Sequence, residues 1–305
     1  MGQPATRIVS LLPSATEICF ALGLDENIVG VTHECDYPAS AQLKPQITRS
    51  KTTAALTSRE IDALVRSQLD ETGSIYELDL EMLEALRPDI ILTQQLCTVC
   101  AVSFDYVAEQ AATLTTVPQV INLEPKSLED VFHSIARVAA LVGQPEKAEA
   151  MLSGLRTRVD HVREAVALLP KRKAMVLEWI DPPFASGHWI PELVALAGGE
   201  NTIGFLHAPS REVSWEQILA SLPEVLIVAE CGFGVERQLQ DIDFLLSRVG
   251  SDIPEIWVCD GSQYFSRPGP RLVDTLEMIS GILHVELREQ MLSKFQDTKD
   301  IVRIH

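Results

Sequence analysis

Basic side chains are scarce in this sequence. Its 305 residues include 25 Lys and Arg against 43 Asp and Glu, which gives a net charge of −18 at pH 7. Phosphate backbones are bound by concentrated Lys and Arg, so this composition argues against DNA or RNA as a partner. An acidic surface also keeps a protein soluble, and the charge by itself therefore points to no other partner.

Long apolar runs are absent as well. No segment reaches the roughly 18 consecutive apolar residues of a membrane-spanning helix. The chain enters the strand-like Ile8–Leu12 without the charged, apolar and small-residue regions of a secretion signal. We therefore expect a cytoplasmic protein without membrane insertion, or a periplasmic or extracellular one if a leader has been removed. Six cysteines are too few for a disulfide framework.

Local signatures of catalysis are missing too. The sequence has no Gly-rich phosphate loop, no Gly-x-Ser-x-Gly turn and no His-Glu-x-x-His helix. Acidic residues are numerous, but no two of them have a spacing in the sequence that indicates a catalytic acid–base pair. The sequence predicts a binding protein rather than an enzyme.

Strand-like and helix-like segments alternate along the chain, which is long enough for two lobes. Short β-branched runs predict the strands, and apolar residues at helical spacing predict the helices between them. The predicted strands are Arg7–Leu11, Ile28–Val31, Ile90–Thr93 and Gln119–Asn122, and after Pro170 they are Ala174–Trp179, Val225–Val228 and Ile256–Cys259. This alternation predicts an α/β fold whose central sheets are of the parallel type and are flanked by helices.

The middle of the chain, 127–169, has almost no strand signal. Gly143-Gln144-Pro145 ends one helix, and Pro145 suits the first turn of the next. Residues 146–168 are then predicted as one helix of about six turns, roughly 35 Å long at 1.5 Å per residue. We expect an N-terminal lobe (1–125), a helical segment (126–170) that contains this rigid spine helix, and a C-terminal lobe (171–305). The alternative is that the helix packs on one lobe only.

The two halves also share a pattern. In each half a Glu stands seven residues before a Pro, and the Pro is followed by an acidic residue and an apolar strand. The pattern puts Glu81 and Glu216 at equivalent places, each near the start of a helix that the proline ends. It suggests that the two lobes are built alike.

Several stretches resemble a known family: Ile8-Val9-Ser10-Leu11-Leu12-Pro13-Ser14-Ala15-Thr16-Glu17, Asp36-Tyr37-Pro38, Leu83-Glu84-Ala85-Leu86-Arg87-Pro88-Asp89-Ile90-Ile91, Ser214-Trp215-Glu216-Gln217-Ile218 and Tyr264-Phe265-Ser266-Arg267-Pro268-Gly269-Pro270-Arg271. Over about residues 7–285 the chain resembles class III substrate-binding proteins of ABC importers, which bind vitamin B12, ferric siderophores or haem. The cobalamin-binding branch is the most similar. The resemblance implies two lobes, a spine helix, a ligand cleft between the lobes and an ABC permease as partner, and we expect a monomer.

Ligands of open α/β sheets bind outside the carboxyl ends of the strands, and this rule selects the candidate binding residues. A loop of the second half places Trp179, Phe184, His188 and Trp189 close together in sequence, which suits a flat ligand such as a corrin. We expect Pro182-Pro183 to exclude a helix or a central strand from this loop. The full candidate set is Ser14, Tyr37, Gln94, Trp179, Phe184, His188, Trp189, Phe233, Tyr264 and Arg267.

Each of these candidates has a structural alternative. The two tryptophans can fill the core. His188 can serve as an axial metal ligand or as a hydrogen-bonded structural residue. Arg267 suits a ligand amide or carboxylate. Gln94 and Ser210 stand near places where the resemblance leads us to expect tryptophans.

The resemblance gives Glu81 and Glu216 a further role, because one acidic residue of each lobe pairs with permease arginines in importers. The alternative is that these carboxylates only stabilise the starts of their helices.

Extra cysteines distinguish the chain from the secreted cobalamin binders. His33, Cys35, Cys97 and Cys100 follow predicted strands and form a candidate soft-metal site, because Cys-x-x-Cys lets two thiolates reach one ion. The alternatives are buried packing and a redox-labile pair.

Together these features predict a non-catalytic binder of cobalamin or a related corrinoid, as the substrate-binding component of an ABC-type uptake system or a cytoplasmic relative of one. One alternative is a ferric siderophore, haem or another metal chelate as the ligand. A second alternative, of another class, is a cytoplasmic metal- or redox-responsive protein that uses the cysteines.

Overall fold

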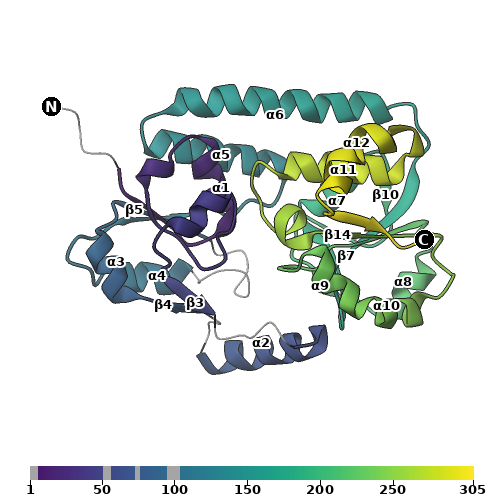
Figure 1. Ribbon diagram of the computed structural model, residues 1–305, viewed down its shortest axis with the longest axis horizontal. Helices are drawn as coiled ribbons and strands as arrows, with labels where there is room; N and C mark the ends of the chain where they lie inside the picture. The colour runs from purple at the N-terminus through teal and green to yellow at the C-terminus, as the bar shows by residue number, and fades with distance from the viewer. Residues whose placement is uncertain (1–5, 51–55, 73–75, 95–103) are drawn as a thin grey trace. The chain divides into compact units, whose positions relative to one another are not determined.

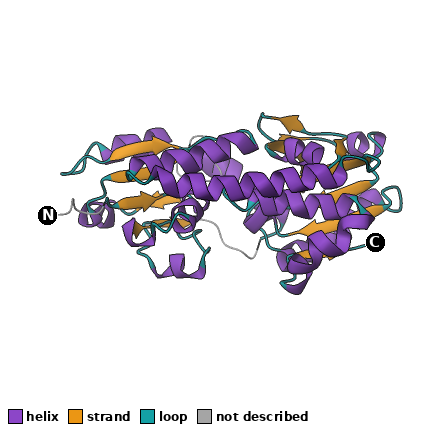
Figure 2. Ribbon diagram, turned by 90° about the horizontal axis from the view of Figure 1, so that it is seen from above, coloured by secondary structure: helices purple, strands orange, loops and turns teal. Residues whose placement is uncertain are grey.

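Parallel strands form the central sheets of the protein in a computed structural model that describes residues 6–50, 56–72, 76–94 and 104–305 (Figure 1). The chain divides into two units. The first contains Met1–Leu56, Glu60–Pro125 and Phe132–Leu152. The second contains Thr57–Arg59, Lys126–Val131 and Ser153–His305. In each unit helices accompany the strands (Figure 2).

The sheet of the first unit has four parallel strands in the order β2-β1-β5-β6. They are β1 (Ile8–Ser10), β2 (Ile28–Gly30), β5 (Ile90–Thr93) and β6 (Gln119–Asn122). All four lie at predicted places. Strands β1 and β5 are buried along their length, as expected for parallel strands with helices on both faces.

The remaining elements of this unit include a small antiparallel pair that was not predicted, β3 (Thr48–Ser50) with β4 (Tyr76–Leu78). The helices are α1 (Pro13–Ala21), α3 (Leu80–Leu86) and α4 (Phe104–Ala111), with short 3₁₀ turns at Asp25–Asn27 and Ala39–Leu43. Helices α2 (Ser58–Thr72), α5 (Leu128–Leu141) and α6 (Pro145–Val166) each have residues in both units.

The sheet of the second unit is mixed. Strands β7 (Arg172–Ile180), β13 (Val225–Val228) and β14 (Glu255–Cys259) form its parallel centre, and β10 (Gly199–Asn201) also pairs in parallel with β7. Antiparallel strands complete it: β8 (Pro183–Ala185), β12 (Arg211–Glu212) and β15 (Ile301–Arg303). A separate parallel pair consists of β9 (Gly187–His188) and β11 (Phe205–Leu206). The α/β class with parallel central sheets is confirmed.

Strand β8 overturns one expectation. Pro182-Pro183 were expected to exclude a central strand, yet β8 begins at Pro183 and lies between β7 and β12. Proline lacks an N–H, but its carbonyl still accepts a ladder hydrogen bond. Here the carbonyl of Pro183 accepts from the N–H of Val213 at 2.9 Å. A proline at the first residue of a strand therefore leaves this ladder intact.

Helices of the second unit pack around this sheet. They are α7 (Ile190–Leu196), α8 (Trp215–Ala220), α9 (Val235–Gln238), α10 (Ile242–Val249), α11 (Leu272–Leu283) and α12 (Arg288–Asp297). Three shorter elements are 3₁₀ turns at Leu239–Asp241 (η3) and Val285–Leu287 (η5) and a π-helical turn at Gly261–Phe265 (η4). Among the described residues, none of the helices has the length and apolar character that a bilayer span requires.

Helix α6 is one continuous helix of 22 residues, close to the predicted range of 146–168. It begins at Pro145, where the missing N–H of proline costs no intrahelical hydrogen bond. Its residues up to Leu152 belong to the first unit, and those from Ser153 onward belong to the second.

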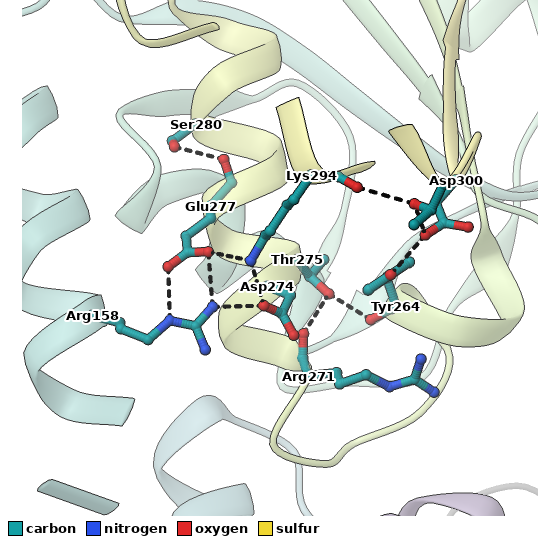
Figure 3. A network of polar contacts seen from close by, with 10 residues as sticks. Arg158, Tyr264, Arg271, Asp274, Thr275, Glu277, Ser280, Lys294 and Asp300 are labelled. Atoms are coloured by element: carbon teal, nitrogen blue, oxygen red, sulfur yellow. Dashed lines mark hydrogen bonds and ion pairs between the residues drawn. The ribbon is translucent and has the colours of Figure 1, made fainter. Parts of the chain in front are cut away.

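Arg158 fixes α6 within the second unit (Figure 3). Its guanidinium donates two hydrogen bonds of 2.8 Å to Glu277 and one of 2.6 Å to Asp274, both on α11. Lys294 of α12 donates to the same two carboxylates at 2.7 and 2.8 Å. Burial opposes ionisation of Glu277, but the hydrogen bonds from the two cations outweigh it and lower the pKa of this carboxyl. Three helices are thus joined by a charge-balanced cluster.

We expect the Arg158→Met variant to lose about 1–2 kcal/mol of unfolding free energy, because charge-assisted hydrogen bonds in a partly buried cluster are lost while their carboxylates stay. Arg163→Met on the same helix is the matched control. Arg163 pairs with Asp160 at 3.5 Å, and both side chains are more than 60% exposed, so its loss should stay below about 0.5 kcal/mol. Urea unfolding of the two variants measures both values. Equal losses would contradict the role given to Arg158.

Candidate functional site

The carboxyl ends of β7 and β13 lie side by side in the second unit. Val228 is the register partner of Leu177, and the pairing continues beyond the strand because the N–H of Cys231 donates to the carbonyl of Glu178 at 3.0 Å. Residues 178–181 at the carboxyl end of β7 and 229–233 after β13 therefore share one edge of the sheet. We call this the β7/β13 edge. It is the place where open α/β sheets bind ligands.

An aromatic cluster lies at the β7/β13 edge. The rings of Trp179 and Phe233 are 5.1 Å apart and tilted by 39°. Phe184 on β8 is the cross-strand partner of Trp179, so the two side chains stand on the same face of the sheet. The guanidinium of Arg237 lies 4.5 Å from the centre of the Phe233 ring and is paired with Asp241 at 2.8 Å. Three of the predicted ligand residues are thus brought together.

Two buried carboxyls at this edge were not predicted. Burial raises the pKa of Glu178 to about 7, against hydrogen bonds from the hydroxyl of Ser210 and the N–H of Gly187. Burial also raises the pKa of Glu230 to about 7, and this residue is fully buried. Near neutral pH each carboxyl carries a proton part of the time, so the edge can both donate and accept hydrogen bonds.

A third carboxyl, Asp260, follows the neighbouring strand β14. Burial raises its pKa, although its oxygens accept from the main chain and side chain of Gln263 at 2.7 and 2.8 Å. The only sequence signal for these three residues is an acid directly inside or after an apolar run, and that pattern occurs widely on protein surfaces.

Trp189 lies away from solvent, and His188 beside it is half-buried. Trp189 is 5% exposed, and its indole N–H donates to the carbonyl of Phe265 at 3.0 Å. The His188 ring stacks against it with centroids 5.4 Å apart. These contacts favour the structural alternative for Trp189.

Tyr264 and Arg267 follow β14 in and after the π-helical turn η4. The Tyr264 hydroxyl donates to Asp300 at 2.8 Å (Figure 3), and its ring packs edge-on against Phe295. Arg267 is 6% exposed and donates to the hydroxyl of Ser262 at 3.1 Å. A buried guanidinium near a sheet edge suits a carboxylate on a ligand.

The candidates in the first unit differ in exposure. Ser14 is buried in the first turn of α1, and Tyr37 is 46% exposed. Gln94, directly after β5, is buried, and its side-chain oxygen has no hydrogen-bond partner among the residues that the structure describes. A buried amide oxygen without a partner is available to a donor on a ligand.

The proposed soft-metal site lies only partly within the described residues. The Cys35 sulfur lies 3.1 and 3.2 Å from the hydroxyls of Thr16 and Thr32. The His33 ring contacts Thr48 and Glu34 through its two nitrogens, at 2.8 and 3.2 Å. Cys97 and Cys100 lie outside the described residues. Within residues 6–50, 56–72, 76–94 and 104–305, no group of three or more His, Cys, Asp or Glu side chains is placed to hold a metal.

Glu81 and Glu216 occupy matching places in the two units. Each is exposed and stands second in its helix, α3 or α8, behind a side-chain N-cap, Asp79 or Ser214. A left-handed residue ends each pattern just before the proline, with φ of 45° at Arg87 and 52° at Leu222. The repeated sequence pattern is therefore also a repeated structure.

Comparison with known proteins agrees with this architecture. The model of the periplasmic binding protein family matches residues 8–250. A vitamin B12-binding protein of Vibrio cholerae serotype O1 is 24% identical over 290 residues, which is 94% of this chain and 92% of that protein.

Solved structures have the same fold. The periplasmic vitamin B12-binding protein of Vibrio cholerae has a TM-score of 0.68 at 21% identity, over 92% of this chain and 98% of that one. The periplasmic heme-binding protein from Roseiflexus sp. RS-1 has a TM-score of 0.66 at 23% identity, over 91% and 97%. Because the family model matches residues 8–250, most of its length, the chain belongs to the periplasmic binding protein family.

Proposed function

We propose that the protein binds cobalamin or a related corrinoid, without catalytic turnover, as the substrate-binding component of an ABC-type uptake system. The β7/β13 edge carries this proposal, because it combines an aromatic surface with carboxyls that hold protons near neutrality. The relative of Vibrio cholerae that aligns with 94% of the chain is named for vitamin B12 binding and supports it. Gln94, Ser14 and Tyr37 of the first unit are proposed as further ligand contacts.

A corrinoid suits this edge chemically. Its corrin ring is broad and apolar, and its rim carries amide groups that both donate and accept hydrogen bonds. Trp179, Phe184 and Phe233 offer an apolar surface to the ring. Glu178 and Glu230 offer both donors and acceptors to amides, whereas a carboxylate can only accept and is repelled by the ionised fraction of the two groups.

Haem is the second candidate ligand, and one residue favours it. Haem carries two carboxylates, and buried Arg267 is the described group best suited to bind one. The fold likeness to the heme-binding protein from Roseiflexus sp. RS-1 is consistent with either ligand. His188 is proposed as an axial metal ligand in both cases. The metal- or redox-responsive alternative depends on Cys97 and Cys100 and stays a prediction.

Titration with cyanocobalamin and, separately, with haemin distinguishes the two ligands. We expect saturable one-to-one binding of cyanocobalamin, seen as a shift of its visible absorption bands and as heat in calorimetry. Haemin should bind more weakly, because its carboxylates cannot donate hydrogen bonds and are repelled by the ionised fraction of Glu178 and Glu230. Saturable haemin binding without any corrinoid binding would reject the corrinoid proposal in favour of haem.

The aromatic surface can be tested with two tryptophans of the same unit. We expect Trp179→Leu to weaken corrinoid binding by about tenfold or more, because a large ring contact is lost. Trp215→Leu is the control, since Trp215 on α8 packs edge-on against Phe244 of α10 rather than at the β7/β13 edge. Circular dichroism verifies that both variants are folded. Equal affinities of the two variants would remove Trp179 from the binding surface.

We also propose that Glu81 and Glu216 bind basic residues of the permease, one from each unit. In cells with the cognate permease, the double variant Glu81→Ala, Glu216→Ala should lose corrinoid uptake while the purified protein keeps its ligand affinity. A double variant of two exposed residues on α6, Glu146→Ala and Glu149→Ala, removes the same charge and should transport normally. Normal uptake by the Glu81, Glu216 variant would refute the docking role.

A further inference from the structure

Three residues, Thr57 and the first two residues of α2, lie at the β7/β13 edge. Thr57–Arg59 belong to the second unit, although the chain on either side of them belongs to the first. Ser58 is 2% exposed, and its carbonyl accepts from the indole N–H of Trp179 at 3.2 Å. Arg59 donates two hydrogen bonds of 3.0 Å to the carboxylate of Asp181. We call Thr57–Arg59 the strap. It contacts a residue proposed to bind the ligand.

The hydroxyl of Ser58 lies between two carboxyls. Its oxygen is 2.8 Å from Oδ2 of Asp241 and 3.2 Å from Oε2 of Glu230. A hydroxyl has one proton, so Ser58 donates to only one of these groups. Its contact with the other is a hydrogen bond only if that carboxyl is protonated and donates to Ser58. Both contacts are full hydrogen bonds only when one of the two carboxyls carries a proton.

Glu230 is the carboxyl that carries this proton. Asp241, on η3, already accepts from Arg237 of α9 at the same Oδ2 that faces Ser58, which makes it the acceptor. Glu230 is fully buried, and its Oε1 has no hydrogen-bond partner among the residues that the structure describes. Burial raises its pKa to about 7, and Asp241 adds to the rise, while Ser58, Arg237 and the main chain of Ile180 oppose it.

We propose that the strap is a proton-dependent cover of the β7/β13 edge, docked when Glu230 is protonated and released when it ionises. A charged Glu230 faces Asp241 across a hydroxyl that can donate to only one of them, so the docked strap loses a hydrogen bond and gains a repulsion. The direction follows from the raised pKa: docking is strongest in acid and weakens as the pH rises through about 7.

Release of the strap affects the ligand as well, and this part rests on the proposed function. The docked strap lies on the edge to which a ligand would bind, and its Ser58 carbonyl shares the indole N–H of Trp179 with the carbonyl of Asp181. Ligand and strap therefore compete. We expect corrinoid affinity to be higher at pH 8 than at pH 6.

Hydrogen exchange of the peptide that contains the strap tests docking without any ligand. After correction for the intrinsic pH dependence of exchange, protection in the wild-type protein at pH 6 should exceed that at pH 8 by about fivefold or more. Glu230→Gln keeps the shape of the protonated acid and a donor for Ser58, so it should be protected at both pH values. Ser58→Ala should be unprotected at both. Equal protection of the wild-type strap at pH 6 and pH 8 overturns the proposal.

A matched variant separates Glu230 from the other titrating carboxyl. Glu178 also has a pKa of about 7, but it contacts Ser210 and Gly187 rather than the strap. Glu178→Gln should leave the pH response of the strap as in the wild type. If Glu178→Gln abolishes this response and Glu230→Gln keeps it, Glu230 is not the switch.

Cyanocobalamin titrations of the wild type and Glu230→Gln at both pH values then distinguish the two proposals. A strap that responds to pH in a protein that binds no corrinoid refutes the proposed ligand and leaves the strap in place. Equal corrinoid affinity at pH 6 and pH 8, with a strap that does respond, refutes the competition between strap and ligand. The expected result is an affinity that rises with pH in the wild type and stays at the low value in Glu230→Gln.

Discussion

The register of β7 against β13 is the constraint on which the candidate site depends. Strand β7 is the longest of the described strands, and it pairs with β13, β10 and β8. Its residues 174–177 are fully buried, and their packing fixes which side chains of β7 point to each face of the sheet. A shift of one residue would turn Trp179 away from the face it shares with Phe184 and bring Glu178 there instead. The apolar core of the second unit thus decides which side chains reach the binding edge.

Burial at this edge has a chemical consequence. The protein is strongly acidic, yet the carboxyls of Glu178 and Glu230 are held in surroundings that disfavour their charge. An edge of this kind presents less negative charge to a ligand than its composition suggests. Its carboxyls can donate as well as accept, which suits neutral groups such as amides, and Arg267 is a described residue that suits a carboxylate.

Features that depend on neighbouring residues could be predicted from the sequence, whereas features that depend on residues far apart in the chain could not. Strands β5 and β6 were predicted residue for residue, because a buried parallel strand is a short apolar run between breakers. Trp179, Phe184 and Phe233 were each predicted as candidates, since strand ends can be located from local pattern, but the sequence grouped Trp179 and Phe184 with His188 and Trp189 rather than with Phe233. Glu230 and Ser58 were not predicted as functional residues. They are 172 residues apart, and no local pattern brings a hydroxyl to a particular acid over that distance. The prediction that Pro183 excludes a central strand was wrong for another reason. Proline does lack an N–H, but at the start of β8 the ladder uses only the carbonyl of Pro183.

The strap shows why a proton, rather than an ion pair, is the effective control at this edge. Arg59 makes the more conspicuous contact, a two-bond pair with Asp181, but its side chain is 73% exposed. Water solvates such a guanidinium almost as well when it is released, so the pair adds little and varies little with pH. Glu230 has no access to water in the docked state, and its charge must therefore be avoided or compensated inside the protein. The buried carboxyl thus makes the docked strap sensitive to pH, while the exposed pair contributes mainly to its position.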